Sequence, residues 1–301
     1  MRSVYVASAT LFAVALCHAG TLVGIGVDRN RPFDRYNPVG LPYRIDPMTG
    51  ATTLITQNFT PYDVGPVGPP SPYVYLSAGD SPYPATIFAT NGNDLHTVNF
   101  DTGVAAYYYA GCCGGPPELA YDSDHHVLYA GGGNSIGTIP LGYCPMGPCP
   151  PGTLVGTFDA QIYALGYVPG EGLYGVDMNT GMLYRIDGNT AALTPVGPTG
   201  VGLMVNGLSI TDIEFDSTAG RMIASAGGPE PLFPSAPYDT LLPSGKIYLL
   251  DRFTGSTTLL NDNAPNFFSL VEVSPEPVSL ILVGGALLML CLRYRPNRNR
   301  C

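Results

Sequence analysis

Apolar and polar positions alternate along this chain in one short unit that recurs. The unit is an aromatic or aliphatic residue, any residue, an apolar residue, Asp or Asn, two further residues, then Thr and Gly. Copies cover residues 43–50, 96–103, 174–181 and 248–255, and a degenerate copy at 184–190 is followed by Ala191 where glycine is expected. A period of two ending in a polar turn with glycine predicts a β-hairpin at each copy.

The turn of each copy supplies its own backbone chemistry. The Asp or Asn side chain accepts hydrogen bonds from backbone N–H groups, and glycine supplies the positive φ that closes the turn. Thr-rich segments such as 51–54 and 256–259 follow the turns and are expected to return antiparallel. The residues assigned to these turns are Asp46, Gly50, Asn99, Gly103, Asp177, Gly181, Asp187, Asp251 and Gly255.

A second element precedes several hairpins and sets a longer period. Its aromatic positions are Tyr121, Tyr167 and Phe215, which lie 46 and 48 residues apart. About four short strands in a period near 46 is typical of a β-propeller blade. We therefore expect an all-β body over residues 20–273, a propeller of about five or six blades whose last strand covers 267–273. A β-sandwich with hairpin insertions is the alternative.

Composition agrees with an all-β fold. The chain has 38 Gly, 30 Pro and no Trp, and 45% of its residues are hydrophobic. So much turn-forming sequence argues against a helical bundle, and so many apolar residues argue against disorder. Residues 20–274 hold 8 basic and 22 acidic residues. An acidic body of this kind predicts no nucleic-acid partner.

The N-terminal residues 1–19 are typical of a secretory signal peptide. Arg2 precedes an apolar run from Val4 to Cys17, and Ala19 offers a small residue for cleavage. Lipid attachment at Cys17 is disfavoured because Leu16 stands where a small residue is needed. The sequence thus predicts an exported protein.

The C-terminal residues 274–301 have three parts in a fixed order. Pro275, Glu276 and Pro277 come first, and an uncharged run of 15 residues from Val278 to Leu292 follows. As a helix this run would measure about 22 Å, shorter than a ~30 Å hydrocarbon core. The basic tail consists of Arg293, Arg295, Arg298 and Arg300. By the positive-inside rule this tail would stay in the cytoplasm and the body outside. An ordinary single-span anchor is the simplest interpretation of a hydrophobic C-terminal helix.

This order of motif, short apolar helix and arginine cluster resembles the PEP-CTERM sorting segment of exopolysaccharide-producing Gram-negative bacteria. The resemblance covers residues 274–301; it departs from the family pattern where Pro296, Asn297 and Asn299 dilute the basic tail, which ends in Cys301. It implies as partners an exosortase, the secretion machinery and, transiently, the inner membrane. It also implies processing near residues 275–277, with the mature protein at the cell surface or in the matrix. The repeats resemble hairpins of extracellular propeller-like proteins that carry such tails, a likeness of fold alone.

Four cysteines fall in the exported body: Cys112, Cys113, Cys144 and Cys149. In an oxidising compartment they predict two disulfides, with three connectivities open. We favour bridges from the 112/113 pair to 144 and 149, and partial pairing is the alternative. A zinc site that joins these thiols to His125 or His126 lacks a second spaced pair of ligands, and adjacent histidines on a strand would point to opposite faces.

Two further patterns are weighed and set aside. Residues 133–137 match G-x-S-x-G, but no helix follows, so we interpret them as a glycine turn between strands. The Asp-rich segments 122–124 and 261–263 offer oxygen ligands for calcium without matching a full loop template. We therefore expect no cofactor and no metal, with calcium as the open alternative.

Two classes of function remain. The first is a non-catalytic surface or matrix protein that binds a polysaccharide or a surface protein, in keeping with 20 Tyr that can stack on sugars and with a role in biofilm. The second is an extracellular propeller hydrolase or lyase with carboxylates converging at the axial mouth. The sequence favours the non-catalytic class and assigns no catalytic residue.

Overall fold

The computed structural model describes residues 20–27, 41–55, 77–83, 85–90, 95–100, 105–109, 118–141, 152–227 and 245–273. These residues form antiparallel sheets and one four-residue helix, α2 (Leu203–Asn206), which confirms the all-β prediction. The strands are β1 (Thr21–Val27), β2 (Leu41–Ile45), β3 (Thr52–Leu54), β4 (Ser77–Gly79), β5 (Thr86–Thr90), β6 (Leu95–Asn99), β7 (Ala105–Tyr109), β8 (Glu118–Asp122), β9 (Val127–Ile139), β10 (Thr153–Val168), β11 (Gly172–Asp177), β12 (Met182–Ile186), β13 (Leu193–Pro198), β14 (Ser209–Asp216), β15 (Arg221–Gly227), β16 (Gly245–Leu250), β17 (Thr257–Ala264) and β18 (Asn266–Val273).

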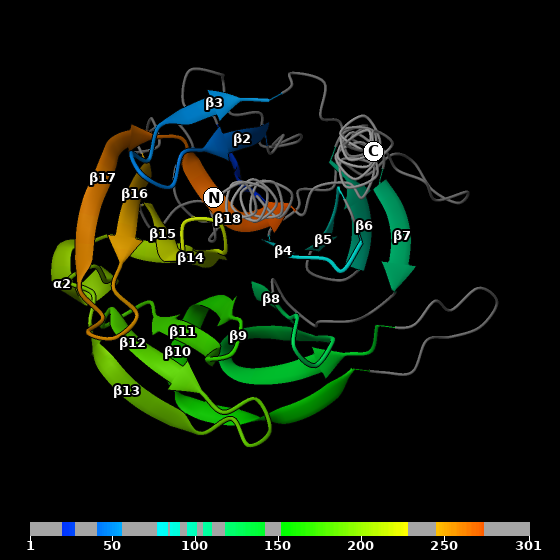
Figure 1. Ribbon diagram of the computed structural model, residues 1–301. Helices are drawn as coiled ribbons and strands as arrows, with labels where there is room; N and C mark the ends of the chain where they lie inside the picture. Colours follow the sequence, from blue (N-terminus) through cyan, green and yellow to red (C-terminus); the bar gives the residue numbers. More distant parts are fainter. Residues whose placement is uncertain are drawn as a thin grey trace, which may run out of the picture.

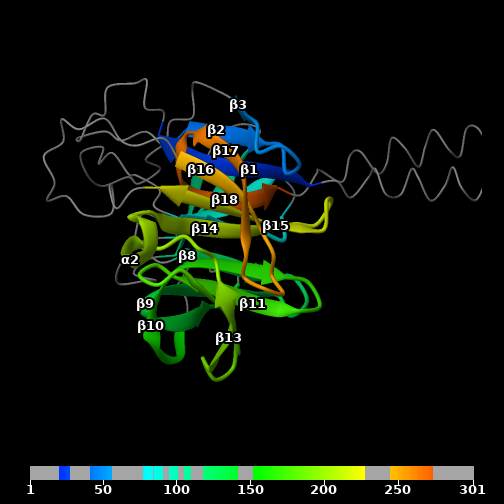
Figure 2. The same ribbon diagram turned by 90° about the vertical axis from the view of Figure 1, so that its left-hand side faces the viewer.

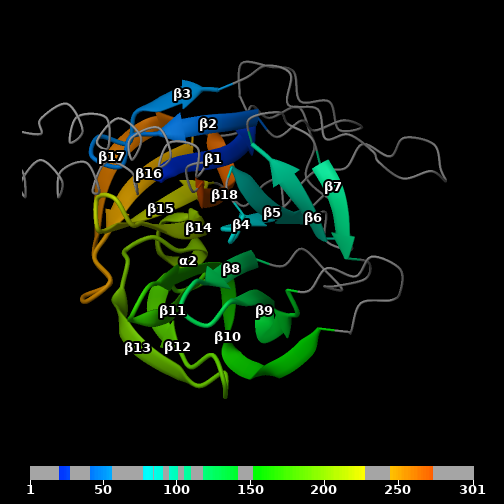
Figure 3. The same cartoon turned by 45° about the vertical axis from the view of Figure 1, so that its right-hand side comes forward.

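The sheets are arranged around a common centre (Figure 1 and Figure 3). Three have four strands, in the orders β18-β1-β2-β3, β4-β5-β6-β7 and β14-β15-β16-β17, and the fourth has six, β8 to β13 in sequence order. In Figure 1, β4, β8, β14 and β18 lie nearest the centre, and β3, β7, β13 and β17 lie at the periphery. The innermost strands are in contact in the order β18, β4, β8, β10, β14, and β14 in turn contacts β18.

The six-stranded sheet combines two groups of strands through its long members. β8 pairs with residues 127–131 of β9, whereas residues 135–138 of β9 pair with the first part of β10 and Gly133 pairs with Ile162. Only the second part of β10, from Ile162 to Val168, pairs with β11. The register shifts between Thr157 and Ile162. β10 therefore belongs to one group at its start and opens the next group at its end.

The hydrophobic core is divided into five clusters, each between neighbouring groups of strands. One joins Val23 and Val271 of the first sheet to Ile87 of β5, and another joins Phe88 of β5 to Leu128 of β9. The remaining three lie between the halves of the six-stranded sheet, between β10–β12 and β14–β16, and between β15–β16 and the β1–β2–β18 sheet. Burial of apolar surface between adjacent groups, rather than within one centre, thus stabilises the fold.

The first and last described strands pair with each other. β1 and β18 are antiparallel, with Thr21 opposite Val273 and Val27 opposite Asn266. Phe267 packs closely on Gly24, where an added Cβ would lie 2.5 Å from the ring, and meets Tyr43 edge to face at 5.7 Å. Both ends of the body are therefore held in one sheet.

Each repeat whose turn is described is a hairpin closed by its aspartate. The Oδ1 atoms of Asp46, Asp177, Asp187 and Asp251 accept the backbone N–H two residues later at 2.8–2.9 Å. Gly50, Gly181 and Gly255 have φ of 69°, 68° and 79° and donate their N–H to the carbonyl of the same aspartate. Asn99 ends β6, and Gly103 lies outside the described residues.

The degenerate copy keeps the same backbone without glycine. Ala191 has φ 59° and donates to the carbonyl of Asp187 at 2.8 Å. Its Cβ occupies a buried site against Gly156, where a second Cβ would lie 2.8 Å away. Glycine at 156 leaves the room that alanine at 191 needs.

One prediction about the body is wrong, two agree with the observed strands, and the others concern residues outside those described. The glycine turn predicted at 133–137 is wrong, because these residues lie within β9, where Gly133 with φ 65° marks the bend. The second periodic element corresponds to β8 and to the ends of β10 and β14, which are three of the innermost strands, and the last strand ends at Val273 as expected. Residues 1–19 and 274–301 and the four body cysteines lie outside the described residues. Within the described residues, no helix has the length and apolar character needed to cross a bilayer.

Substitution of Gly50 tests the packing of the turns. Gly50→Ala places a Cβ 2.8 Å from the Cβ of Leu260 at a positive φ. We expect a loss of about 2–4 kcal/mol from backbone strain and overpacking together. Gly220→Ala is the control, since Gly220 has φ 65° and nothing within 4 Å of an added Cβ; it should lose about 1 kcal/mol. The loss of stability is measured by thermal unfolding followed by circular dichroism. Equal losses for the two variants would show that the Leu260 side chain moves aside without cost.

Candidate functional site

A cavity of about 630 Å³ opens between three turns at one end of the strands. The turns connect β8 to β9, β10 to β11 and β12 to β13. Its polar lining includes Asp122, Asp124, His125, Tyr129, Tyr167, Glu171 and Asn189, and its apolar floor is formed by Val127, Leu173 and Ile186. A concave site with a few convergent polar groups is the usual form of a ligand pocket. We call it the turn pocket.

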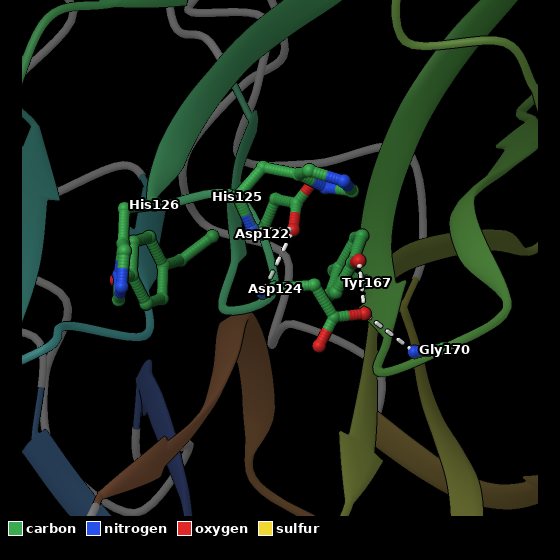
Figure 4. A network of polar contacts seen from close by, with 7 residues as sticks. Asp122, Asp124, His125, His126, Tyr167 and Gly170 are labelled. Atoms are coloured by element: carbon green, nitrogen blue, oxygen red, sulfur yellow. Dashed lines mark hydrogen bonds and ion pairs between the residues drawn. The ribbon is translucent and has the colours of Figure 1, made fainter.

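Asp122 organises the β8–β9 turn. Its side chain is buried, and Oδ1 accepts the backbone N–H groups of Asp124 and His125, both at 2.9 Å (Figure 4). Its Oδ2 accepts a hydrogen bond from His125 Nδ1 at 2.9 Å. This hydrogen bond, and the carboxylate charge behind it, raise the pKa of the exposed His125 imidazole above its usual value.

Asp124 connects the β8–β9 turn to the β10–β11 turn by hydrogen bonds. Its Oδ2 accepts the Tyr167 hydroxyl at 2.8 Å and the Gly170 N–H at 2.6 Å (Figure 4). The bond from Gly170, followed by that from Tyr167, lowers the pKa of Asp124. Burial and the two carboxylates raise the pKa of Tyr167, which stays a neutral donor. Two turns that are 46 residues apart thereby form one rigid wall of the pocket.

Glu171 closes another side of the pocket through an ion pair. Arg252 donates from Nε and Nη2 to both Glu171 oxygens at 2.8–3.0 Å, and Tyr174 donates at 3.1 Å. The guanidinium also lies 4.4 Å from the Phe253 ring centroid. Hydrogen bonding to Arg252 lowers the pKa of Glu171 and raises that of Arg252. Most of the Glu171 charge is therefore compensated within the protein.

The tyrosines of the pocket offer little ring surface to a ligand. Tyr129 and Tyr167 are each 8% exposed and pack in the hydrophobic core. The Tyr129 hydroxyl lies against Gly188, where an added Cβ would be 2.2 Å from it. Stacking on sugar rings is thus weaker here than the tyrosine content suggested. The pocket instead offers carboxylate oxygens and the exposed amide of Asn189 to hydroxyl groups.

The lining of the turn pocket holds no complete nucleophilic centre. Asp122 and His125 form an acid–base pair, but the described lining contains no Ser, Thr, Cys or Lys beside it. Glycoside hydrolysis by a pair of carboxyl groups needs one protonated group as the general acid beside an ionised one. The pKa values of Asp124 and Glu171 are both lowered by the hydrogen bonds that they accept, which does not suit either to the acid role.

A second group of carboxylates lies near the centre on the innermost strands, and the sequence did not single it out. Asp80, which follows β4, accepts the Glu272 N–H of β18 at 2.7 Å, and Asp212 of β14 accepts the Leu270 N–H of β18 at 2.7 Å. Glu214 lies beside them and accepts the Phe215 N–H. Burial is the largest cause that raises the pKa of Asp80, Asp212, Glu214 and Glu272, and repulsion from neighbouring carboxylates adds to the rise at each of them. At Asp212 the hydrogen bonds from Leu270, Ile213 and Ser269 partly oppose the rise in pKa. None of the four lines the turn pocket.

The predicted site residues stay apart. Each aspartate of the repeat turns bonds within its own hairpin, and only the turn of Asp187 borders the pocket, through Gly188 and Asn189. His125 and His126 point in opposite directions, and His126 Nδ1 lies 2.7 Å from the Tyr121 hydroxyl (Figure 4). Asn261 bonds the carbonyl of Gly50 and the N–H of Asn263. Among the described residues no group of three or more His, Cys, Asp or Glu side chains is placed to hold a metal.

Comparison with known proteins gives a fold-level likeness only. No family model and no curated protein matches the chain. Among solved structures, a chain of a nidogen/laminin complex aligns with TM-score 0.49 and 9% identity over 84% of this chain and 98% of its own. A protein from Lactobacillus plantarum aligns with TM-score 0.41 and 11% identity over 83% and 98%. A Bacteroides thetaiotaomicron protein of unknown function aligns with TM-score 0.40 and 13% identity over 80% of this chain and 50% of its own. At these values no activity transfers to this chain.

The pairing of Asp122 with His125 predicts a change that NMR can measure. Asp122→Asn removes the negative charge but keeps an oxygen acceptor for the turn. The pKa of His125 should fall toward the ordinary value near 6.5, because the charged imidazole loses its partner. An unchanged titration of the His125 ring protons would show that the pair does not form in solution.

Neutralising one of the central carboxylates is expected to change the stability of the protein in a way that depends on pH. A pKa raised in the folded state means that stability is full below the unfolded pKa and is lost as pH rises through the folded pKa. Glu214→Gln should therefore raise the melting temperature at about pH 8 and leave it unchanged near pH 3, where Glu214 is protonated in both the folded and the unfolded state. Glu171→Gln is the control with the opposite sign, because the pKa of Glu171 is lowered and its pairing with Arg252 stabilises the folded state above about pH 5. A Glu214→Gln effect of equal size at both pH values would contradict the assignment.

Proposed function

We propose that this chain is an exported, non-catalytic surface or extracellular-matrix protein that binds a polysaccharide through the turn pocket. Its body is a closed propeller of five blades, and its C-terminal segment is an exosortase-processed sorting signal that directs it to a biofilm or exopolysaccharide matrix. The proposal combines the targeting segments at the two ends of the sequence with the chemistry of the pocket. The single observation that carries it is the order Pro275-Glu276-Pro277, apolar run and arginine tail immediately after the last strand.

Closure into five blades is supported by three observations. The innermost strands are in contact in a cycle of five, and five core clusters separate five groups of strands. β1 completes the sheet that ends with β18, so the chain ends supply one blade together. In this interpretation the six-stranded sheet is two adjacent blades that share β10.

The pocket chemistry supports a polyhydroxylated ligand. Asp122 and Asp124 hold their conformation without any ligand, because each is bonded to backbone N–H groups. Preorganised acceptors lose little entropy on binding. A neutral or weakly charged glycan fits a pocket with carboxylate acceptors, an amide and an apolar floor better than a phosphate or nucleic acid, which the negative charge repels.

The central carboxylates favour the runner-up, an extracellular hydrolase or lyase. Raised pKa values are typical of general acids, and Asp80 and Glu272 are adjacent. Asp80→Asn distinguishes the two functions. An enzyme would lose turnover of host exopolysaccharide while its folded state persists, whereas the non-catalytic protein shows no turnover in either form.

Sorting is tested by intact mass and cell fractionation in an exosortase-positive host and in its exosortase-deleted counterpart. We expect loss of the tail near residues 275–277 only where the exosortase is present. A Glu276→Ala variant should behave in the positive host as the parent does in the deleted one. Retention of the whole tail in both hosts would make the segment an ordinary anchor.

Binding is tested with exopolysaccharide purified from the same host. Asn189→Ala should weaken binding about five- to tenfold, the loss that follows from removal of one hydrogen bond of about 1–1.4 kcal/mol. Asn179→Ala is the matched control, because Asn179 follows β11 at the end away from the pocket. Equal affinities of the two variants in isothermal titration calorimetry would place the binding surface elsewhere.

A further inference from the structure

The strands around the centre all end on one face of the body. The Glu272 N–H near the end of β18 donates to Asp80, which follows the end of β4. The Ser217 hydroxyl, in the turn after β14, donates to the same Glu272 side chain at 2.7 Å. We define this as the strand-end face, marked by Asp80, Asp216 and Val273.

The turn pocket lies on the same face. Asp122 is the last residue of β8, and Tyr167 is next to the last residue of β10. The last part of β10 lies against the last part of β14: Gly166 is two residues from the end of β10, Ile213 is three residues from the end of β14, and an added Cβ at Gly166 would lie 2.6 Å from the Ile213 carbonyl oxygen. Both strands then continue to the face that carries Val273. The opposite face carries α2, which precedes the start of β14; in Figure 2 α2 lies at the left, and β18 runs toward the right.

The chain leaves the strand-end face with almost no tether. Only four residues, 274–277, separate Val273 from the apolar run that begins at Val278. Fully extended, they span at most about 14 Å, and two of them are proline, which restricts their freedom further. The N-terminal end of the body lies there too, because Thr21 pairs with Val273.

We propose that a chain held in a membrane by its C-terminal segment presents the turn pocket to the bilayer, so that polysaccharide reaches the pocket only after release. The inference rests on the proposed function for its anchor and its ligand. The pocket lies between turns at this face, and a bilayer within about 14 Å of the face obstructs the approach of a polymer to it. Release of the tail removes the obstruction without any change in the body.

The orientation is measured on the full chain in phospholipid vesicles. A cysteine is introduced at the pocket by Asn189→Cys or on the opposite face by Met204→Cys, where Met204 is 79% exposed. Labelling by a bulky, membrane-impermeant maleimide is read by peptide mass, which separates these sites from the chain's own cysteines. We expect the Asn189→Cys site to label at least about tenfold more slowly than the Met204→Cys site, because the tether geometry excludes the reagent.

A flexible Gly/Ser insert between Val273 and Ser274 supplies the control. About 30 inserted residues give a mean reach of about 30 Å and should bring the two labelling rates within about twofold of each other. Equal rates with the native tether overturn the inference, as does a chain that fails to float with the vesicles. Slow labelling at the Asn189→Cys site that persists with the long insert also overturns it.

Failure of the proposed polysaccharide binding can be told apart from failure of the proposed orientation at the membrane. If the released chain does not bind exopolysaccharide, the ligand assignment falls while the labelling ratio still reports the orientation. If labelling rates are equal but the released chain binds, the pocket function stands and its gating by the membrane does not.

Discussion

The antiparallel pairing of β1 with β18 is the constraint on which the rest of the structure depends. It joins residues 21–27 to residues 266–273 and thereby places both ends of the body in one sheet. The same pairing positions Val23 and Val271 against β5, and Phe267 against β2. Contacts of β18 with β4 and β14 then link the remaining sheets through buried carboxylates that accept backbone N–H groups. Because these pairings join residues far apart in sequence, the fold is expected to form slowly and cooperatively.

The hydrogen bonds of the repeat turns can be predicted from the sequence because each turn is encoded within eight consecutive residues. Asp46, Asp177 and Asp251 accept the bonds that their spacing from glycine predicts, and the period near 46 located β8 and the ends of β10 and β14. Residues 133–137 were misassigned because glycines also mark bends within a strand, and β9 is long enough to bend. A turn and a bend require the same residue, so composition alone cannot separate them.

The pocket and the central carboxylates depend on contacts between distant segments, and the sequence carries only faint signs of them. Asp124 meets Gly170 across 46 residues, and Glu171 meets Arg252 across 81. The alternation Asp212, Glu214, Asp216 places three carboxylates on one face of β14, which was a usable sign of a polar face near the axis. This alternation does not by itself distinguish a buried polar face, because an exposed strand ordinarily shows the same pattern of alternating polar residues.

The pair formed by Ala191 and Gly156 bears on how the repeats have diverged. In the copies at Gly50, Gly181 and Gly255 glycine takes the left-handed turn position, and here alanine takes it while a facing glycine leaves it space. Return to glycine at 191 would relieve the backbone but leave a small buried void, and any side chain at 156 would collide with the present methyl group. Alanine at 191 therefore depends on glycine at 156, whereas glycine at 156 does not depend on alanine at 191. A side chain at 156 is expected only in a relative of this protein that has glycine at 191, so the turn of the degenerate copy limits which residue the facing strand can carry.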